Sequence, residues 1–231
     1  MRSFFIDSKL SVDQIFTLPK EESKHACKVL RLTSGTIIQL VNGKGDAYEA
    51  EIRIADQKAC QVLVTNHIEA QKDSHHIHIA IAPTKSNDRF EFFLEKATEL
   101  GVHEITPIRS KNSERTVIKP ERFEKVLKAA MKQSQRLFLP KLNPLTSFSD
   151  FIKQHDKGCI AHCEDTHRYT FNDEVTQMNC PILIGPEGDF TKEEIIKAFK
   201  NNFKAVTLGK TRLRTETAGL YACMIMKNKF E

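Results

Sequence analysis

The chain has 231 residues, of which 28% are charged, and a formal net charge of +5, values typical of a globular protein with one or two domains. A mildly basic balance permits a nucleic-acid partner without requiring one. The sequence has no run of 18 apolar residues and no apolar leader, which excludes a helical membrane span and favours a cytoplasmic protein.

Six cysteines occupy positions 27, 60, 159, 163, 180 and 223, and no two of them form a Cys-x-x-Cys motif. That motif is typical of zinc ribbons and thioredoxin-like sites, so neither kind of site is expected. A chain of this size does not need disulfides for stability, and we expect free thiols in a reducing compartment.

The first 70 residues are rich in predicted β-strands, which cover residues 36–41, 48–54 and 60–64. Polar and glycine-rich turns separate these strands, a pattern that favours a small barrel or sandwich. A helix is predicted before them, over residues 19–31. Its cations Lys24, Lys28 and Arg31 are spaced three and four apart, so we expect them on one helix face. Such a face can contact phosphates or simply face solvent.

Polar residues 69–76 predict a linker to a second domain. His75, His76 and His78 lie at its end, a grouping that raises the question of a metal site. Alternation along a strand places these histidines on different faces, and no further ligands stand at a suitable spacing. We therefore expect no metal.

Predicted strands and helices alternate from residue 78 onward, which is the pattern of an α/β protein. An apolar stripe predicts a helix over 89–100 that ends at Gly101, and Pro120 begins another that continues to residue 136. A short helix is predicted over 148–155 and a strand from 158, while residues 165–180 look irregular and polar. Between the strand at 104–108 and the helix at Pro120, a polar loop carries the cations Arg109, Lys111 and Arg115.

Two strand–loop–helix units complete the chain. The buried strand 182–184 runs into Gly185-Pro186-Glu187-Gly188, and a capping-box pattern at 191–194 then begins a helix. The strand 205–208 runs into a second loop that contains Gly209, Leu213 and Arg214, before an apolar helix through residue 226. Loops that follow parallel strands lie at one edge of a sheet, so we expect one ligand pocket shared by both loops.

These two motifs, Gly-Pro-Glu-Gly and Leu-Gly-x-x-x-Leu-Arg-x-Glu-Thr-Ala, resemble those of the knotted SPOUT-class RNA methyltransferases. Within that class the chain is most similar to enzymes that methylate N3 of a uridine in small-subunit ribosomal RNA. Arg2-x-Phe-Phe and His25-x-x-x-Val-Leu-Arg also resemble the start of that family. One departure is Asp189, which stands where relatives commonly carry a second glycine.

The resemblance implies a PUA-like RNA-binding β-barrel over residues 1–70 and an α/β SPOUT methyltransferase domain with a trefoil knot over residues 71–231. It further implies S-adenosyl-L-methionine as cofactor, a homodimer, and a substrate in 16S ribosomal RNA within the small subunit or its assembly intermediate. The residues expected to hold the cofactor are His162, Ile184, Gly185, Pro186, Glu187, Gly188, Leu208, Gly209 and Leu213. The residues expected to contact RNA are Arg2, Lys24, His25, Lys28, Arg31, Arg109, Arg115 and Arg136.

Arg214 and Glu216 are the expected catalytic residues, because they are the polar groups at the point where the second motif enters its helix. Uridine N3 must lose a proton to become nucleophilic. We expect Arg214 to stabilise the resulting negative charge, and Glu216 either to accept the proton or to orient Arg214. An ordinary salt bridge at a helix start is the alternative. Methylation of another RNA position and a non-catalytic ribosome-assembly factor are the competing functions.

Overall fold

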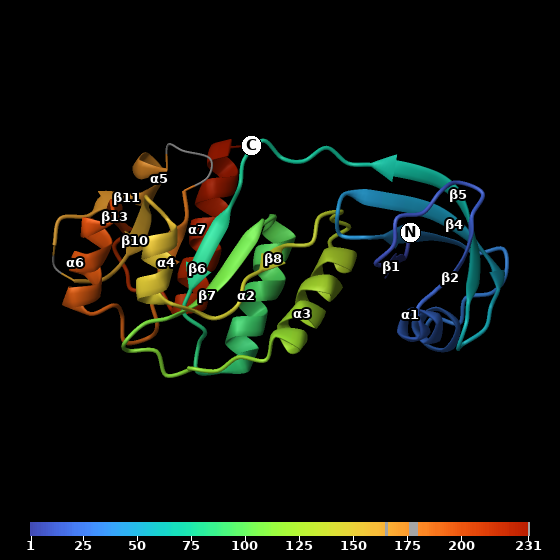
Figure 1. Ribbon diagram of the computed structural model, residues 1–231, viewed down its shortest axis with the longest axis horizontal. Helices are drawn as coiled ribbons and strands as arrows, with labels where there is room; N and C mark the ends of the chain where they lie inside the picture. Colours follow the sequence, from blue (N-terminus) through green and yellow to red (C-terminus); the bar gives the residue numbers. More distant parts are fainter. Residues whose placement is uncertain (165, 176–179, 231) are drawn as a thin grey trace. The chain divides into compact units, whose positions relative to one another are not determined.

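The computed structural model describes residues 1–164, 166–175 and 180–230 (Figure 1). Contacts divide the chain into two compact units. The first contains Met1–Lys72 and Met131–Leu139, and the second contains Asp73–Ala130 and Pro140–Glu231. Two sheets form the framework, one in each unit.

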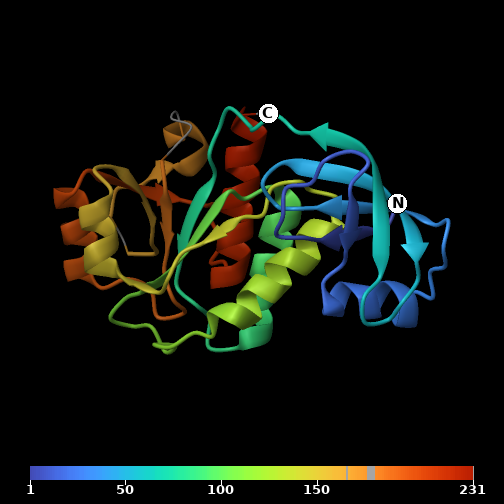
Figure 2. The same ribbon diagram turned by 45° about the vertical axis from the view of Figure 1, so that its right-hand side comes forward.

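The sheet of the first unit has the order β1-β3-β4-β5-β2. Its strands are β1 (Ser3–Phe5), β2 (Ile15–Thr17), β3 (Ile37–Val41), β4 (Asp46–Ile54) and β5 (Gln61–Glu69). β4 pairs antiparallel with both β3 and β5, and register shifts near Ala50 and Ile52 interrupt its pairing with β5. Such irregularities bend a strand, and the sheet curls in Figure 2. The three strands predicted in this region are confirmed.

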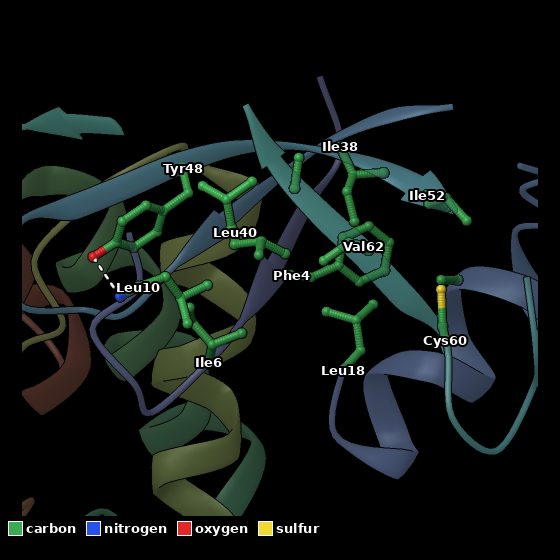
Figure 3. Packing of buried hydrophobic residues seen from close by; sticks show 13 residues of the cluster. Phe4, Ile6, Leu10, Leu18, Ile38, Leu40, Tyr48, Ile52, Cys60 and Val62 are labelled. Carbon is green, nitrogen blue, oxygen red and sulfur yellow. Dashed lines mark hydrogen bonds between the residues drawn. The ribbon is translucent and has the colours of Figure 1, made fainter. Parts of the chain in front are cut away.

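The core of the first unit lies on the inner face of this sheet (Figure 3). Alternate residues of β3 and β4, among them Ile38, Leu40 and Tyr48, are fully buried, as the period of two in a strand requires. The Tyr48 hydroxyl accepts a hydrogen bond from the Leu10 backbone amide at 3.2 Å, so its one polar atom is satisfied inside the core.

The prediction of one regular helix over residues 19–31 is wrong. The chain forms α1 (Lys20–Lys24), then a π-helical turn η1 (His25–Val29), and Arg31 follows with a φ of 53°. A π turn bonds residues five apart, so a spacing of three or four no longer aligns side chains on one face. Arg31 lies beyond the helix, and therefore Lys24, Lys28 and Arg31 do not share a helix face.

The sheet of the second unit is parallel throughout, in the order β11-β13-β10-β12-β6-β7-β8, with β9 pairing β7. Its strands are β6 (His78–Ile81), β7 (Glu104–Arg109), β8 (Lys141–Leu142), β9 (Thr146–Ser147), β10 (Gly158–Ala161), β11 (Tyr169–Thr170), β12 (Ile182–Ile184) and β13 (Phe203–Thr207). The predicted α/β class is confirmed. Residues 169–174, expected to be irregular, form β11 and a helical turn, while residues 165 and 176–179 lie outside the described residues.

Helices cover both faces of this sheet (Figure 1). The helices that follow β6 in the chain are α2 (Asn87–Leu100), α3 (Pro120–Gln133), α4 (Phe148–Gln154), α5 (Phe171–Glu174), α6 (Lys192–Lys200) and α7 (Thr215–Phe230). α4 and α6 pack on Leu183 of β12, whereas Gly219 of α7 lies against Phe93 of α2 and Ile81 of β6 on the other face. A Cβ at Gly219 would stand 2.7 Å from Phe93, so glycine permits this close approach.

The predicted helix signals are confirmed. Gly101 ends α2 in the left-handed conformation with a φ of 92°, and Thr191 caps α6 with a full capping box to Glu194. In the described ranges, none of the helices combines the length and the apolar character that a bilayer crossing needs.

β13, β10 and β12 are neighbours in this sheet, which places the three loops that follow them together. Because the strands are parallel, the loops after β10, β12 and β13 all leave the same edge of the sheet. In open α/β sheets this is the edge at which ligands bind.

His78 makes the stability of the second unit dependent on pH. It is 4% exposed on β6, and its Nε2 lies 2.7 Å from the Thr106 hydroxyl. Burial lowers its pKa to about 4, so between pH 6.5 and pH 4 the unfolded chain binds more protons than the folded one. Stability is therefore lost as the pH falls through this window. Burial also lowers the pKa of His103, which acts in the same direction.

We expect His78 to contribute about 2 kcal/mol to the loss of unfolding free energy between pH 7 and pH 5. Urea denaturation of wild type and of His78→Gln at both pH values measures this contribution, since glutamine does not titrate. The variant should lose correspondingly less stability on acidification, whatever its stability at pH 7. An equal loss in both proteins would contradict the assignment.

Candidate cofactor pocket

One pocket of about 690 Å³ lies where the three loops meet. Its volume falls in the range of small-molecule sites, roughly 300–1,000 Å³. Three stretches supply its lining: residues 161–164 at the end of β10 and in the loop after it (the first loop), residues 184–189 at the end of β12 and in the loop after it (the second loop), and residues 206–215 at the end of β13, in the loop after it (the third loop) and at the start of α7. Arg168 and Ala218 add to the wall.

The pocket brings together every residue predicted to hold the cofactor. His162 comes from the first loop, Ile184 to Gly188 from the end of β12 and the second loop, and Leu208, Gly209 and Leu213 from the third loop. Arg214 lines the same pocket, whereas Glu216 is not among its lining residues. What these residues do stays a prediction.

The second loop is held by its neighbours on both sides. Thr215 donates a hydrogen bond to the Gly185 carbonyl at 3.1 Å, which joins the third loop to the second. From the loop after β7, the side-chain amide of Asn112 donates a hydrogen bond to the Gly188 carbonyl at 3.0 Å. A Cβ at Gly185 would stand 3.2 Å from Phe190, so a side chain there would crowd the loop.

His162 is the most unusual polar group in the pocket. The residue is 5% exposed, and neither ring nitrogen has a hydrogen-bond partner among the described residues. Burial lowers its pKa, with Asp189 acting in the opposite direction, so the imidazole is neutral near pH 7. Neutral imidazole offers one donor and one acceptor, and leaving both unpaired in a buried place is costly. A ligand with polar groups would satisfy them.

Gly209 lets the third loop turn toward the pocket. Its φ is 131°, a conformation that side-chain-bearing residues rarely adopt, and its carbonyl accepts a bond from the Thr207 hydroxyl at 2.9 Å. No described atom lies within 4 Å of the place where a Cβ would stand. Glycine is therefore favoured at this position by the backbone conformation, since there is enough space for a larger side chain.

We expect Gly209→Ala to weaken cofactor binding about tenfold, because alanine forces the third loop out of its conformation. Titration calorimetry with S-adenosylmethionine measures the dissociation constant. Gly35→Ala is the matched control: Gly35 has a φ of 85°, and open space likewise surrounds its Cβ position. Its strain falls in the first unit, and the control should bind as wild type does. Equal affinities in all three proteins would contradict the prediction.

The two expected catalytic residues differ in their surroundings. Arg214 is exposed, and its side chain makes no hydrogen bond or ion pair within the described part of the chain. Glu216 is 8% exposed, and its Oε1 lies 3.9 Å from Arg89 Nε on α2. The charged partner of Glu216 is thus Arg89 rather than Arg214.

The loop after β7 supports the site from outside. Arg115 Nε donates to the Thr84 carbonyl at 2.9 Å and its Nη2 donates to the Lys85 carbonyl. Lys85 in turn donates its backbone amide to Glu187 of the second loop at 3.2 Å. The guanidinium of Arg115, a residue expected to contact RNA, therefore bonds to backbone carbonyls of this chain. Arg109, at the end of β7, is exposed.

The remaining residues expected to contact RNA lie in the first unit. Arg2, Lys24, Lys28 and Arg31 are exposed there. His25 is half-buried beside Phe4, with Nδ1 at 4.0 Å from Glu22, and Arg136 is also half-buried. The two units thus each hold part of the predicted RNA-contacting set.

Outside the pocket, the structure brings together a group of possible metal ligands that the sequence analysis did not expect. Ligand atoms of Asp73, His75 and His103 lie within 4.8 Å of one another, a grouping that sequence spacing did not reveal because His103 is distant in the chain. His103 Nδ1 accepts the Ile77 amide at 3.0 Å, so its Nε2 carries the proton and donates to Asp73 at 3.1 Å. This tautomer offers no lone pair on Nε2 to a metal.

Comparisons with known proteins agree with the geometry. Residues 71–227 match the family described as RNA methyltransferase domain, and residues 18–65 match the RNA methyltransferase PUA domain. The ribosomal RNA small subunit methyltransferase E of Mesomycoplasma hyopneumoniae (strain 232) is 36% identical over 149 residues, which are 62% of this chain and 64% of that protein.

Solved structures extend the similarity to the whole chain. A probable rRNA-methyltransferase from Porphyromonas gingivalis has a TM-score of 0.90 at 37% identity, covering 100% of this chain and 98% of that one. A ribosomal RNA small subunit methyltransferase E from Neisseria gonorrhoeae, solved bound to S-adenosyl methionine, has a TM-score of 0.89 at 28% identity, covering 99% and 97%.

These matches confirm the predicted α/β methyltransferase domain and the PUA-like domain before it. The chain belongs to the RNA methyltransferase family, where it groups with the proteins named ribosomal RNA small subunit methyltransferase E.

Proposed function

We propose that the protein methylates N3 of a uridine in 16S ribosomal RNA, with S-adenosylmethionine as the methyl donor. The observation that carries the proposal is the convergence of three loops on one pocket that brings together all the residues predicted to hold the cofactor. The similarity to a relative solved with S-adenosyl methionine supports the choice of cofactor.

The pocket residues fit this cofactor. His162 offers an unpaired donor and acceptor, and the glycines of the second and third loops expose backbone groups to a ligand. We propose that these groups, together with Ile184, Leu208 and Leu213, hold the adenosyl portion. S-adenosylmethionine supplies an already electrophilic methyl group, so the protein must bind, orient and exclude water rather than activate a nucleophile of its own.

Arg214 is proposed to stabilise the negative charge that develops on a uracil oxygen when N3 loses its proton. Its position suits this role, because the guanidinium lines the pocket with no competing partner among the described residues.

Glu216 is proposed to accept the N3 proton. The alternative, that it orients Arg214, loses support from the contact between Glu216 and Arg89. At 3.9 Å that ion pair is loose, and the carboxylate keeps lone pairs with which to accept a proton.

The proposed substrate context is the small ribosomal subunit or its assembly intermediate. Exposed cations of the first unit, Arg2, Lys24, Lys28 and Arg31, are proposed to contact phosphates. A homodimer is also proposed, because Tyr221 and Met224 of α7 are 45% and 46% exposed and offer an apolar surface. A protein that modifies ribosomal RNA would act in the cytoplasm.

Incubation with methyl-labelled S-adenosylmethionine and small subunits from a strain without this activity tests the proposal. Mass mapping of the product nucleosides should find 3-methyluridine in 16S RNA. A methyl group on a ribose oxygen would favour the other enzymatic function. Absence of cofactor binding in calorimetry, with RNA binding intact, would favour an assembly factor.

A further inference from the structure

We infer that Asp189 is a positioning residue, which fixes the first loop against the second so that His162 faces the bound cofactor. The inference rests on the proposed function, since it takes S-adenosylmethionine as the ligand of the pocket. It concerns a residue at which this chain departs from the glycine expected by resemblance.

The carboxylate of Asp189 joins the two loops directly. Its Oδ2 accepts the backbone amide of Cys163 in the first loop at 2.7 Å, and its Oδ1 accepts the backbone amide of Phe190 at 2.7 Å. Hydrogen bonds from amides to a carboxylate are short and about twice as strong as neutral ones. Asp189 therefore holds residue 163 to the start of the α6 segment.

A hydrogen bond from Arg168 completes a clamp on a single peptide group. The amide of Cys163 belongs to the same peptide bond as the carbonyl of His162, and that carbonyl accepts a bond from Arg168 Nη1 at 2.7 Å. A negative side chain thus holds one end of the peptide group and a positive side chain holds the other. Since a peptide group is planar, fixing both of its ends fixes its orientation.

The clamped peptide group adjoins the side chain that needs orientation. His162 is 5% exposed and lines the pocket, and neither of its ring nitrogens has a hydrogen-bond partner among the described residues. A buried donor and acceptor can bind a ligand only where the backbone places the ring correctly. The clamp supplies that placement through the backbone of the first loop.

The backbone conformation of Asp189 allows its carboxylate to be removed without straining the chain. Asp189 has a φ of 60°, a conformation that glycine, asparagine and aspartate tolerate. Asp189→Gly removes both acceptors without strain. Asp189→Asn keeps the shape and one acceptor, but its amide nitrogen cannot accept the second bond.

We expect Asp189→Gly to raise the dissociation constant of S-adenosylmethionine about tenfold, and Asp189→Asn by a smaller factor. Titration calorimetry measures both. In the methylation assay the change should fall on KM for the cofactor more than on kcat. Asp13→Gly is the control, because Asp13 is an exposed aspartate with a φ of 66° in the first unit.

A double-mutant cycle with His162→Ala identifies the route of the effect. If Asp189 acts through His162, Asp189→Gly should change the affinity of the His162→Ala protein by less than twofold. A full tenfold effect in that background would overturn the inference, as would wild-type affinity in Asp189→Gly with a lowered melting temperature. Wild-type protein that does not bind S-adenosylmethionine would instead contradict the proposed function.

Discussion

Replacing Arg214 with alanine should lower the turnover number of methyl transfer about 100- to 1,000-fold. This is the usual cost of removing one group that stabilises a developing oxyanion. The guanidinium lines the pocket and has no partner in the described part of the chain, so its loss removes an interaction with the substrate and leaves no broken salt bridge. Single-turnover methylation of small subunits with labelled cofactor measures the rate.

The affinity for S-adenosylmethionine separates catalysis from damage to the pocket. Arg214→Ala should bind the cofactor within about twofold of wild type, because Gly185 and the glycine of the third loop keep their backbone. Arg53→Ala is the control, as Arg53 is a half-exposed arginine of β4 paired with Glu51. Normal turnover in Arg214→Ala would contradict the assigned role.

Much of the fold follows from local patterns in the sequence. Alternation predicted β3, β4 and β5, and Gly101 and Thr191 marked helix ends that the structure confirms. The three-residue strands β1 and β2 escaped prediction because so short a segment has no measurable period.

Some features depend on contacts that no local pattern encodes. The π turn after α1, which moves Arg31 off the helix, arises within a segment whose composition favours an ordinary helix. The boundary between the two units falls inside α3: Met131–Leu139 belongs to the first unit, whereas the helix up to Ala130 belongs to the second. The prediction of a trefoil knot rests only on the family resemblance, because knots are rare and no periodicity of the sequence indicates them.

The candidate site divides in the same way. The glycine-rich loops were predictable, because parallel strands bring the loops that follow them to one edge. Supporting residues were not predictable: Asn112 and Arg168 bond to the backbone of the pocket loops from separate segments, and neither stands in a motif. The partner of Glu216 was also missed, because the contact with Arg89 joins α7 to α2 across the fold.

Replacing Glu216 with glutamine should lower turnover about 100-fold at neutral pH, the usual range for loss of a general base. Glutamine keeps the size of the side chain and cannot accept a proton. The deficit should shrink as the pH rises, because solvent then removes the N3 proton in its place. Rates measured between pH 6 and pH 9 for wild type and variant test this dependence.

A purely structural role for Glu216 predicts a different result. If the carboxylate only pairs with Arg89, then Arg89→Gln should reproduce the loss, and the ratio of variant to wild-type rate should not change with pH. The ion pair is 3.9 Å long and Arg89 is exposed, so this contribution is small. We expect Arg89→Gln to lose far less activity than Glu216→Gln, which would place the lost rate on proton transfer to the carboxylate.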